Sequence, residues 1–467
     1  MNQSDLIDSN IEAYLHQHEH KGLLRFITCG SVDDGKSTLI GRLLHDSKMI
    51  FEDQLASITK DSKTMGKAGE GELDLALLVD GLASEREQGI TIDVAYRFFS
   101  TDKRKFIIAD TPGHEQYTRN MATGASTAQA AVILIDARHG VQTQTRRHTF
   151  ICTLLSIPHL VVAINKMDLV EFRQKRFEEI RDDYIQFARQ LGIESIEFIP
   201  MSALKGDNVV TPSEKMPWYD GHTLTQWLES VDVSAEFPNQ FTRLPVQSVV
   251  RPDLNFRGFT GTLEAGSLSK GDEITVLPSG KHTRIASLYL AGEPVEKVNT
   301  NQAVMLTTEE EVDISRGSMI VRGDHPTLAR RSEVDFIWMS DEPLTPGKEY
   351  LIKCGTLTTP GRIEHLENKT DVNTMERAPT DSLQLNEIGH GVLNTNEPLI
   401  FDPYTSLRET GSLIVVDRLS NITVGAGLLR GKAQSELKHA GREYTDAERA
   451  LNAYVREHFP EWNCKPV

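Results

Sequence analysis

The chain has 467 residues, which is too long for one ordinary domain and predicts two to four. Hydrophobic residues make up 39% of it, enough for several buried cores. The formal net charge of −17 disfavours a general nucleic-acid binder, because such binding draws affinity from neutralised phosphates. We expect no membrane helix, no secretory signal in residues 1–22, and no disulfide or metal role for the four scattered cysteines, so a cytoplasmic protein is predicted.

The first chemical motif lies between an apolar run, Leu23 to Cys29, and a helical pattern, Thr38 to His45. The residues between them read Gly30-Ser-Val-Asp-Asp-Gly-Lys-Ser37 and fit the pattern G-x-x-x-x-G-K-[ST] in full. A strand that leads through such a turn into a helix directs backbone N–H groups at phosphate oxygens. We expect Lys36 to neutralise the outer phosphates and Ser37 to ligate Mg²⁺. The alternative is a surface glycine turn beside a lysine.

The segment Arg86 to Ile92 contains Thr91 and looks like the effector segment of translational-type GTPases. In that reading the threonine is a second hydroxyl ligand of Mg²⁺, and the loop relaxes when the γ-phosphate is lost. Val32 and Ile90 match the two apolar residues that screen the catalytic histidine in related factors. The alternative is an ordinary β-branched edge strand.

Asp110-Thr-Pro-Gly113 ends the apolar run Phe106 to Ala109. Ligands of open α/β sheets bind at the carboxyl ends of strands, so Asp110 is expected to hold Mg²⁺ through water, and the Gly113 N–H to meet the γ-phosphate. His114 follows directly and is expected to orient the attacking water. The alternative for His114 is a solvated loop histidine.

Asn165-Lys-Met-Asp168 ends another apolar run, Leu160 to Ile164. The Asp168 carboxylate is expected to accept two hydrogen bonds from guanine, whose N1–H and amino group adenine lacks. Asn165 is assigned to the acceptor edge of the base and the Lys166 stem to its ring face. Ser202-Ala203 follows a further apolar run and is expected to offer a backbone N–H to the guanine oxygen. Four motifs at strand ends, in this order, predict GTP as the ligand.

The predicted site gathers these motifs into three sets. The predicted GTP-binding residues are Gly30, Ser31, Val32, Asp33, Asp34, Gly35, Lys36, Ser37, Thr38, Asp110, Thr111, Pro112, Gly113, His114, Asn165, Lys166, Met167, Asp168, Ser202 and Ala203. The predicted metal ligands for the Mg²⁺ that accompanies GTP are Ser37, Thr91 and Asp110, and the predicted catalytic residues are His114, Thr91 and Lys36. Asp33 is a further candidate for holding a monovalent cation beside the polyphosphate.

The pattern of runs predicts an α/β P-loop GTPase domain with a doubly wound, mostly parallel sheet, followed by two β-barrel domains. We expect an N-terminal extension (1–22), the GTP-binding domain (23–235), β-barrels at 240–330 and 332–430, and a C-terminal tail (431–467). In the first barrel, Pro278 to Lys281 is a predicted hairpin turn. In the tail, the capping box Thr445 to Glu448 predicts a helix whose apolar face docks on the chain's own body, with a partner as the alternative.

This organisation resembles elongation factor Tu. Segments along the whole chain are more similar to the large, GTPase subunits of bacterial sulfate adenylyltransferase (ATP sulfurylase), a family of the translation-factor GTPase superfamily; they are Gly30–His45, Glu85–Tyr96, Asp110–Ser126, Asp402–Gly427 and Leu451–Trp462. Translation factors typically have His at the position of Asp34 and often Cys at that of Thr111, so both residues point away from translation.

The resemblance implies a coupled reaction. A smaller, ATP-pyrophosphatase-type subunit would form adenosine 5′-phosphosulfate and pyrophosphate from ATP and sulfate, and GTP hydrolysis on this chain would drive that uphill step. Neither a nucleic acid nor a membrane is expected as a partner. Gly425 to Lys432 lacks the spacing of a second phosphate loop, so a fused kinase activity is not expected. The alternatives are an elongation factor that carries aminoacyl-tRNA and a GTP-binding scaffold without turnover.

Overall fold

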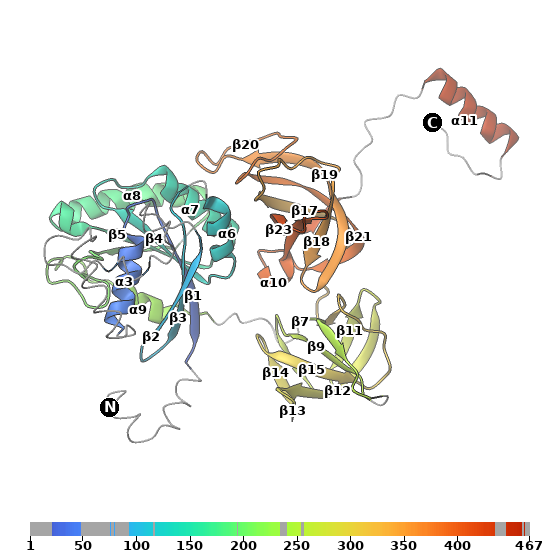
Figure 1. Ribbon diagram of the computed structural model, residues 1–467, viewed down its shortest axis with the longest axis horizontal. Helices are drawn as coiled ribbons and strands as arrows, with labels where there is room; N and C mark the ends of the chain where they lie inside the picture. The colour runs from blue at the N-terminus through green and yellow to red at the C-terminus, as the bar shows by residue number, and fades with distance from the viewer. Residues whose placement is uncertain are drawn as a thin grey trace. The chain divides into compact units, whose positions relative to one another are not determined.

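The chain forms two units, Met1–Gly431 and Lys432–Val467. The structure is a computed structural model and describes residues 21–47, 75, 79, 93–114, 117–193, 195–233, 241–253, 256–434, 445–459 and 462 (Figure 1). The effector segment with Thr91 and most of the predicted N-terminal extension lie outside the described residues. None of the helices in the described ranges has the length and hydrophobicity to cross a bilayer.

A six-stranded sheet in the order β2-β3-β1-β4-β5-β6 begins the first unit. The edge strand β2 runs antiparallel to β3, and the other described neighbours run parallel. The prediction of a mostly parallel, doubly wound sheet is therefore confirmed. Its strands are β1 (Leu23–Cys29), β2 (Ala95–Ser100), β3 (Lys105–Asp110), β4 (Ala130–Asp136), β5 (His159–Asn165) and β6 (Glu197–Pro200), and its helices are α3 (Lys36–Asp46), α6 (Thr118–Ser126), α7 (Thr143–Leu154), η3 (Met167–Val170), α8 (Gln174–Gln190) and α9 (Leu224–Ser230).

Both faces of this sheet are covered by helices (Figure 1), which explains the continuous apolar runs of its central strands. All seven residues of β4 are buried, and alternate side chains enter different cores. Ile133 packs in the core that includes residues of α7 and α8, whereas Val132 packs in the core that includes residues of α3 and α9. Because β1, β3, β4 and β5 run parallel, their carboxyl ends lie at one edge of the sheet.

An antiparallel β-domain follows. Eight strands pair in one sheet and two in another, and apolar side chains from both sheets pack in one core. The predicted turn at Pro278–Lys281 joins β11 to β12 in a hairpin. The strands are β7 (Thr242–Pro245), β8 (Ser248–Val250), β9 (Gly258–Thr262), β10 (Ser267–Ser269), β11 (Glu273–Leu277), β12 (Lys281–Leu290), β13 (Glu293–Val295), β14 (Lys297–Asn299), β15 (Ala303–Thr308) and β16 (Met319–Arg322).

The last part of the first unit is a closed β-barrel. The strand order β18-β22-β23-β17-β21-β19 returns from β19 to β18, and β20 pairs on the outside with β19. Closure removes the exposed strand edges that an open sheet would leave. Its elements are β17 (Thr327–Trp338), β18 (Glu349–Cys354), β19 (Leu357–Thr370), β20 (Arg377–Ala378), β21 (Ile388–Phe401), α10 (Arg408–Gly411), β22 (Ser412–Asp417) and β23 (Thr423–Lys432).

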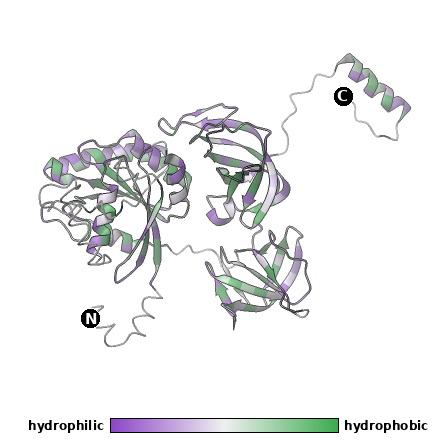
Figure 2. Cartoon of the chain, in the orientation of Figure 1, coloured by the Kyte–Doolittle hydropathy of each residue, from purple (hydrophilic) through white to green (hydrophobic). Residues whose placement is uncertain are grey.

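The second unit contains α11 (Asp446–His458), and the predicted capping box at its start is present. The Thr445 hydroxyl accepts the Glu448 N–H, and the Glu448 carboxylate accepts the Thr445 N–H. Leu451 and Tyr454 are 63% and 54% exposed, so one side of the helix carries apolar surface (Figure 2). What this side binds stays a prediction.

A buried ion pair joins the two β-domains. The Arg243 guanidinium on β7 donates from Nε and Nη2 to the two carboxylate oxygens of Asp402, at 2.9 Å each. Arg243 is fully buried, and the Thr410 hydroxyl gives Asp402 a third hydrogen bond at 3.0 Å. Two parallel charge-assisted bonds fix both distance and angle between the partners. The pair therefore ties β7 to the segment that follows β21.

We predict that Arg243→Met costs about 3–5 kcal/mol of unfolding free energy, because it leaves the Asp402 carboxylate buried without its counter-ion. The double variant Arg243→Met/Asp402→Leu should recover most of this loss. Chemical denaturation measures both. Arg284→Met is the matched control, because its partner Glu273 and Arg284 itself are exposed, and it should cost less than about 1 kcal/mol. Equal losses for Arg243→Met and Arg284→Met would contradict the role given to the buried pair.

Candidate functional site

The loop between β1 and α3 is shaped by two glycines. Gly30 has φ 150° and Gly35, which caps α3, has φ 94°, both in the region that side chains disfavour. A Cβ on Gly35 would lie 2.5 Å from Asn165 Nδ2, and one on Gly30 would lie 2.9 Å from the Leu134 carbonyl oxygen. The loop is thus pressed against the ends of β4 and β5. Its concave side is bounded by Lys36, the first residue of the helix.

The Lys36 ammonium is buried inside this loop. Its Nζ donates to the carbonyl oxygens of Gly30 and Ser31, at 2.9 and 2.8 Å. Burial lowers the pKa of Lys36, and the carboxylates of Asp110 and Asp34 oppose that shift. A Cβ on Gly113 would lie 2.6 Å from this Nζ. The structure therefore brings the first two predicted motifs together at Lys36, where a bound anion would find a cation already in place.

Asp34 lies under the loop rather than in solvent. Its Oδ2 accepts the Ser31 N–H at 2.6 Å, and the residue is buried. Burial raises the pKa of Asp34 to about 6, against the opposing effect of the Lys36 charge. The sequence placed Asp34 in the site by its position alone. The structure adds that its carboxylate shapes the loop.

The base-recognition motif is joined to the phosphate loop. Asn165, at the end of β5, donates from Nδ2 to the Asp34 carbonyl oxygen at 2.8 Å and accepts the Ala203 N–H at Oδ1 at 2.9 Å. Lys166 has φ 62°, and its Nζ lies 3.0 Å from the Asp136 carboxylate and also donates to the Asp33 carbonyl. Asn165 thus binds three of the predicted segments to one another. Its predicted contact with a base, and that of the Ala203 N–H, stay predictions.

The other predicted residues fall around this centre. Thr111 donates its hydroxyl to the Thr28 carbonyl at 2.8 Å and is fully buried, so its side chain holds β3 to β1. Asp168 lies half-buried in η3, and the His114 ring lies 6.2 Å from the Tyr117 ring. Pro112 and Ser202 are buried, whereas Val32 and Asp33 are exposed on the loop, with Thr38 and Met167 at the starts of α3 and η3.

The donor set fits Mg²⁺, which prefers oxygen ligands. Ser37, partly exposed in the first turn of α3, would supply a hydroxyl, and Asp110, at the end of β3, would supply a carboxylate directly or through water. Thr91, the third predicted ligand, lies outside the described residues. The role of the exposed Asp33 as a ligand for a monovalent cation stays a prediction.

Sequence reasoning missed two residues of the site. Asp136 ends β4 and is buried; although burial alone would raise its pKa, hydrogen bonds from Arg138 and Lys166 lower it to about 2. The sequence did contain a signal for Asp136, because this residue ends an apolar run just as Asp110 does. His148 on α7 accepts the Gly30 N–H at Nδ1 at 3.1 Å. No motif marked His148, since its partner is 118 positions away.

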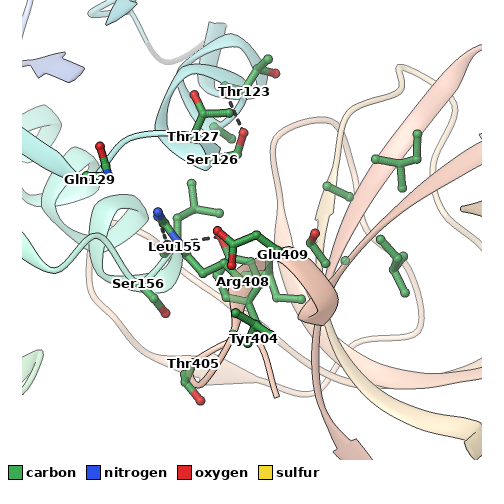
Figure 3. A pocket seen from close by; sticks show the side chains of 18 of the residues that line it. Thr123, Ser126, Thr127, Gln129, Leu155, Ser156, Tyr404, Thr405, Arg408 and Glu409 are labelled. Carbon is green, nitrogen blue, oxygen red and sulfur yellow. Dashed lines mark hydrogen bonds between the residues drawn. The ribbon is translucent and has the colours of Figure 1, made fainter. Parts of the chain in front are cut away.

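A cavity lies away from the phosphate loop, between α6, the end of α7 and the closed barrel (Figure 3). Tyr404 donates its hydroxyl to the Leu155 carbonyl at 3.2 Å, and Arg408 donates to the Ala128 carbonyl at 2.9 Å. These two side chains bind the barrel to the end of α7 (Figure 3). The cavity is therefore part of a contact between domains, while the convergent charged groups lie around Lys36.

Comparisons with known proteins agree along the chain. The family described as "Elongation factor Tu GTP binding domain" matches residues 21–240, and "GTP-eEF1A C-terminal domain-like" matches residues 331–430. Sulfate adenylyltransferase subunit 1 of Aliarcobacter butzleri is 58% identical over 99% of this chain and 98% of its own. The protein of the same name from Alteromonas mediterranea is 55% identical over 100% of this chain and 99% of its own. The crystal structure of sup35 complexed with GMPPNP covers 93% of this chain and 99% of its own at 22% identity, with a TM-score of 0.41, which is too low to support an inference.

We predict that Asp34→Asn stabilises the nucleotide-free protein by about 2 kcal/mol at pH 7.5. Because the pKa of Asp34 is raised from 3.8 to about 6, the folded parent loses stability as the pH rises through this interval, and the amide does not. The gain should shrink at pH 5, which denaturation at both pH values measures. Asp33→Asn, on the exposed neighbour, is the control and should change stability by less than about 0.5 kcal/mol. A gain that does not depend on pH would refute this reading of Asp34.

Proposed function

The chain belongs to the sulfate adenylyltransferase subunit 1 family, and from this premise we propose that its GTP hydrolysis drives the synthesis of adenosine 5′-phosphosulfate by a second subunit. The relatives' name implies that a partner subunit exists. We propose a smaller subunit of the ATP-pyrophosphatase type, which joins sulfate to the α-phosphate of ATP. Its anhydride product is high in energy, so the step needs a second source of free energy.

One observation carries this proposal: 55–58% identity to proteins of that name along their full length, in a chain whose phosphate-loop and base motifs meet around a buried lysine. An elongation factor or an inert scaffold finds no comparable support. Asp34 and Thr111 are both buried and hydrogen-bonded inside the domain, so neither departure from the translation-factor pattern is a chance surface residue.

The proposed chemistry assigns a role to each group. The loop N–H groups and Lys36 would hold the β- and γ-phosphates, and Ser37, Asp110 and Thr91 would hold the Mg²⁺ that neutralises charge developing on the transferred phosphoryl group. Asp168 would select guanine. His114, beside Gly113, would orient the water that attacks the γ-phosphate. We also propose a division into three domains and a tail, with bounds at 23–235, 240–330, 332–430 and 431–467. A cytoplasmic location and a monovalent cation at Asp33 are further proposals.

Exchange of the base specificity tests the function. Asp168→Asn should replace guanine preference by xanthine preference, because the amide can donate a hydrogen bond to the xanthine 2-oxygen. Adenosine 5′-phosphosulfate formation by the chain and its second subunit should then respond to XTP in the variant and to GTP in the parent. The parent with XTP and the variant with GTP are the matched controls. A rate of adenosine 5′-phosphosulfate formation that depends on neither GTP nor XTP, in parent and variant alike, would overturn the proposed coupling.

We predict that His114→Ala leaves GTP affinity within about twofold and slows GTP turnover by roughly 100-fold, because the side chain would act on water rather than on the nucleotide. Phosphate release in a single turnover, with the second subunit present, measures the rate. Tyr117→Phe is the control, since it keeps the ring beside His114 and removes only a hydroxyl. Parent-like turnover in His114→Ala would assign His114 to the solvated loop instead.

A further inference from the structure

A histidine lies beneath the phosphate loop on an element that none of the predicted motifs includes. His148 is buried in α7, and the Gly30 N–H donates to its Nδ1 at 3.1 Å. One turn further along the same face of the helix, Cys152 places its Sγ 3.8 Å from that of Cys29. The inner face of α7 therefore contacts both the last residue of β1, Cys29, and the first residue of the loop, Gly30.

The geometry fixes the protonation state of the imidazole. A backbone amide can only donate, so Nδ1 must be the acceptor and the neutral ring carries its proton on Nε2. Burial, the charge of Lys36 and that of Arg147 together lower the pKa of His148 to about 3. The ring thus stays neutral at physiological pH, which excludes a role as a cation for the phosphates.

Gly30, the first residue of the loop, is held from three directions. His148 accepts its N–H, and Lys36 donates to the Gly30 carbonyl at 2.9 Å. The Leu134 carbonyl on β4 would lie 2.9 Å from any Cβ at Gly30, so the third side is closed as well. A glycine in this position has wide freedom of rotation without such contacts. Both polar backbone groups of Gly30 are thus engaged, the N–H by His148 and the carbonyl by Lys36.

We propose that His148 is a positioning residue for guanine-nucleotide binding: its neutral Nδ1 fixes the Gly30 N–H and so holds the phosphate loop and Lys36 in the binding geometry. This inference rests on the proposed nucleotide site and adds a residue from outside all four motifs. His148 acts through Gly30 and touches no nucleotide. Removal of its acceptor leaves a buried N–H without a hydrogen bond, so the loop turns or shifts to find one.

Two shape-matched substitutions separate the acceptor from the packing. His148→Asn places an amide oxygen, Oδ1, where Nδ1 stands, and keeps the acceptor. His148→Leu branches at the same carbon and fills similar space with a methyl group instead. Thr149→Val is the control for a buried hydrogen bond on the same helix, since the Thr149 hydroxyl pairs with Tyr184 at 2.8 Å, away from the loop.

The measurement uses the full-length chain alone and GDP labelled with a methylanthraniloyl fluorophore, with thermal unfolding of the nucleotide-free protein in parallel. His148→Leu should weaken binding by roughly tenfold or more, and His148→Asn should restore it to within about threefold of the parent. Thr149→Val should lower the unfolding temperature and leave the affinity unchanged. Because no sulfate, ATP or second subunit is present, the result does not depend on whether GTP drives adenylyl transfer.

Two results would overturn the proposal. Parent-like affinity in His148→Leu would make the residue ordinary core, and equal weakening in His148→Leu and His148→Asn would show that the acceptor is not what matters. Where His148→Leu does not fold, His148→Gln takes its place, because its amide lies one bond beyond the Nδ1 position. His148→Gln should then bind at least about fivefold more weakly than His148→Asn, and equal affinities of the two would refute the role.

Discussion

The position of the buried Lys36 ammonium is the constraint on which the nucleotide site depends. Two loop carbonyls accept hydrogen bonds from this buried charge, and the Asp110 and Asp34 carboxylates oppose the lowering of the Lys36 pKa by burial. The two residues that bear these carbonyls are held through their N–H groups, because Gly30 donates to His148 on α7 and Ser31 donates to the Asp34 carboxylate. The loop is therefore preorganised for an anion before one arrives, and an arriving phosphate has little rearrangement to drive.

The sequence predicted the parts of this site better than their connections. The apolar runs before Gly30, Asp110 and Asn165 became buried parallel strands, because a strand covered on both faces reads as an unbroken apolar run. Motif patterns could not predict that the Asn165 side-chain amide forms hydrogen bonds with the backbone of Asp34 and Ala203. Those bonds depend on distances between segments 131 and 38 residues apart, which no local pattern encodes.

The limits of pattern reasoning are clearest at α7. Its residues carry no nucleotide motif, yet three of its neighbouring contacts lead in different directions. His148 contacts the phosphate loop, whereas Arg147 donates from Nη2 to Asn373 Oδ1 of the closed barrel at 3.0 Å. At the far end of the helix, the Leu155 carbonyl accepts the Tyr404 hydroxyl (Figure 3). The helix thus contacts the loop through His148 and the barrel through Arg147, near its middle, and Leu155, at its C-terminal end.

Through these hydrogen bonds α7 connects the described nucleotide site to the closed barrel, and the Arg243–Asp402 pair connects the barrel to the middle β-domain. Any nucleotide-dependent shift of Gly30 must either break its bond to His148 or move the helix that bears it. A moved helix must in turn carry or release Asn373 and Tyr404. Linkage is reciprocal, so a partner that binds the barrel and favours one placement of α7 would favour one state of the phosphate loop by the same free energy. The proposed coupling between GTP hydrolysis and a second subunit needs such a two-way dependence, and α7 is the described element whose adjacent residues, Arg147 and His148, contact the barrel and the phosphate loop.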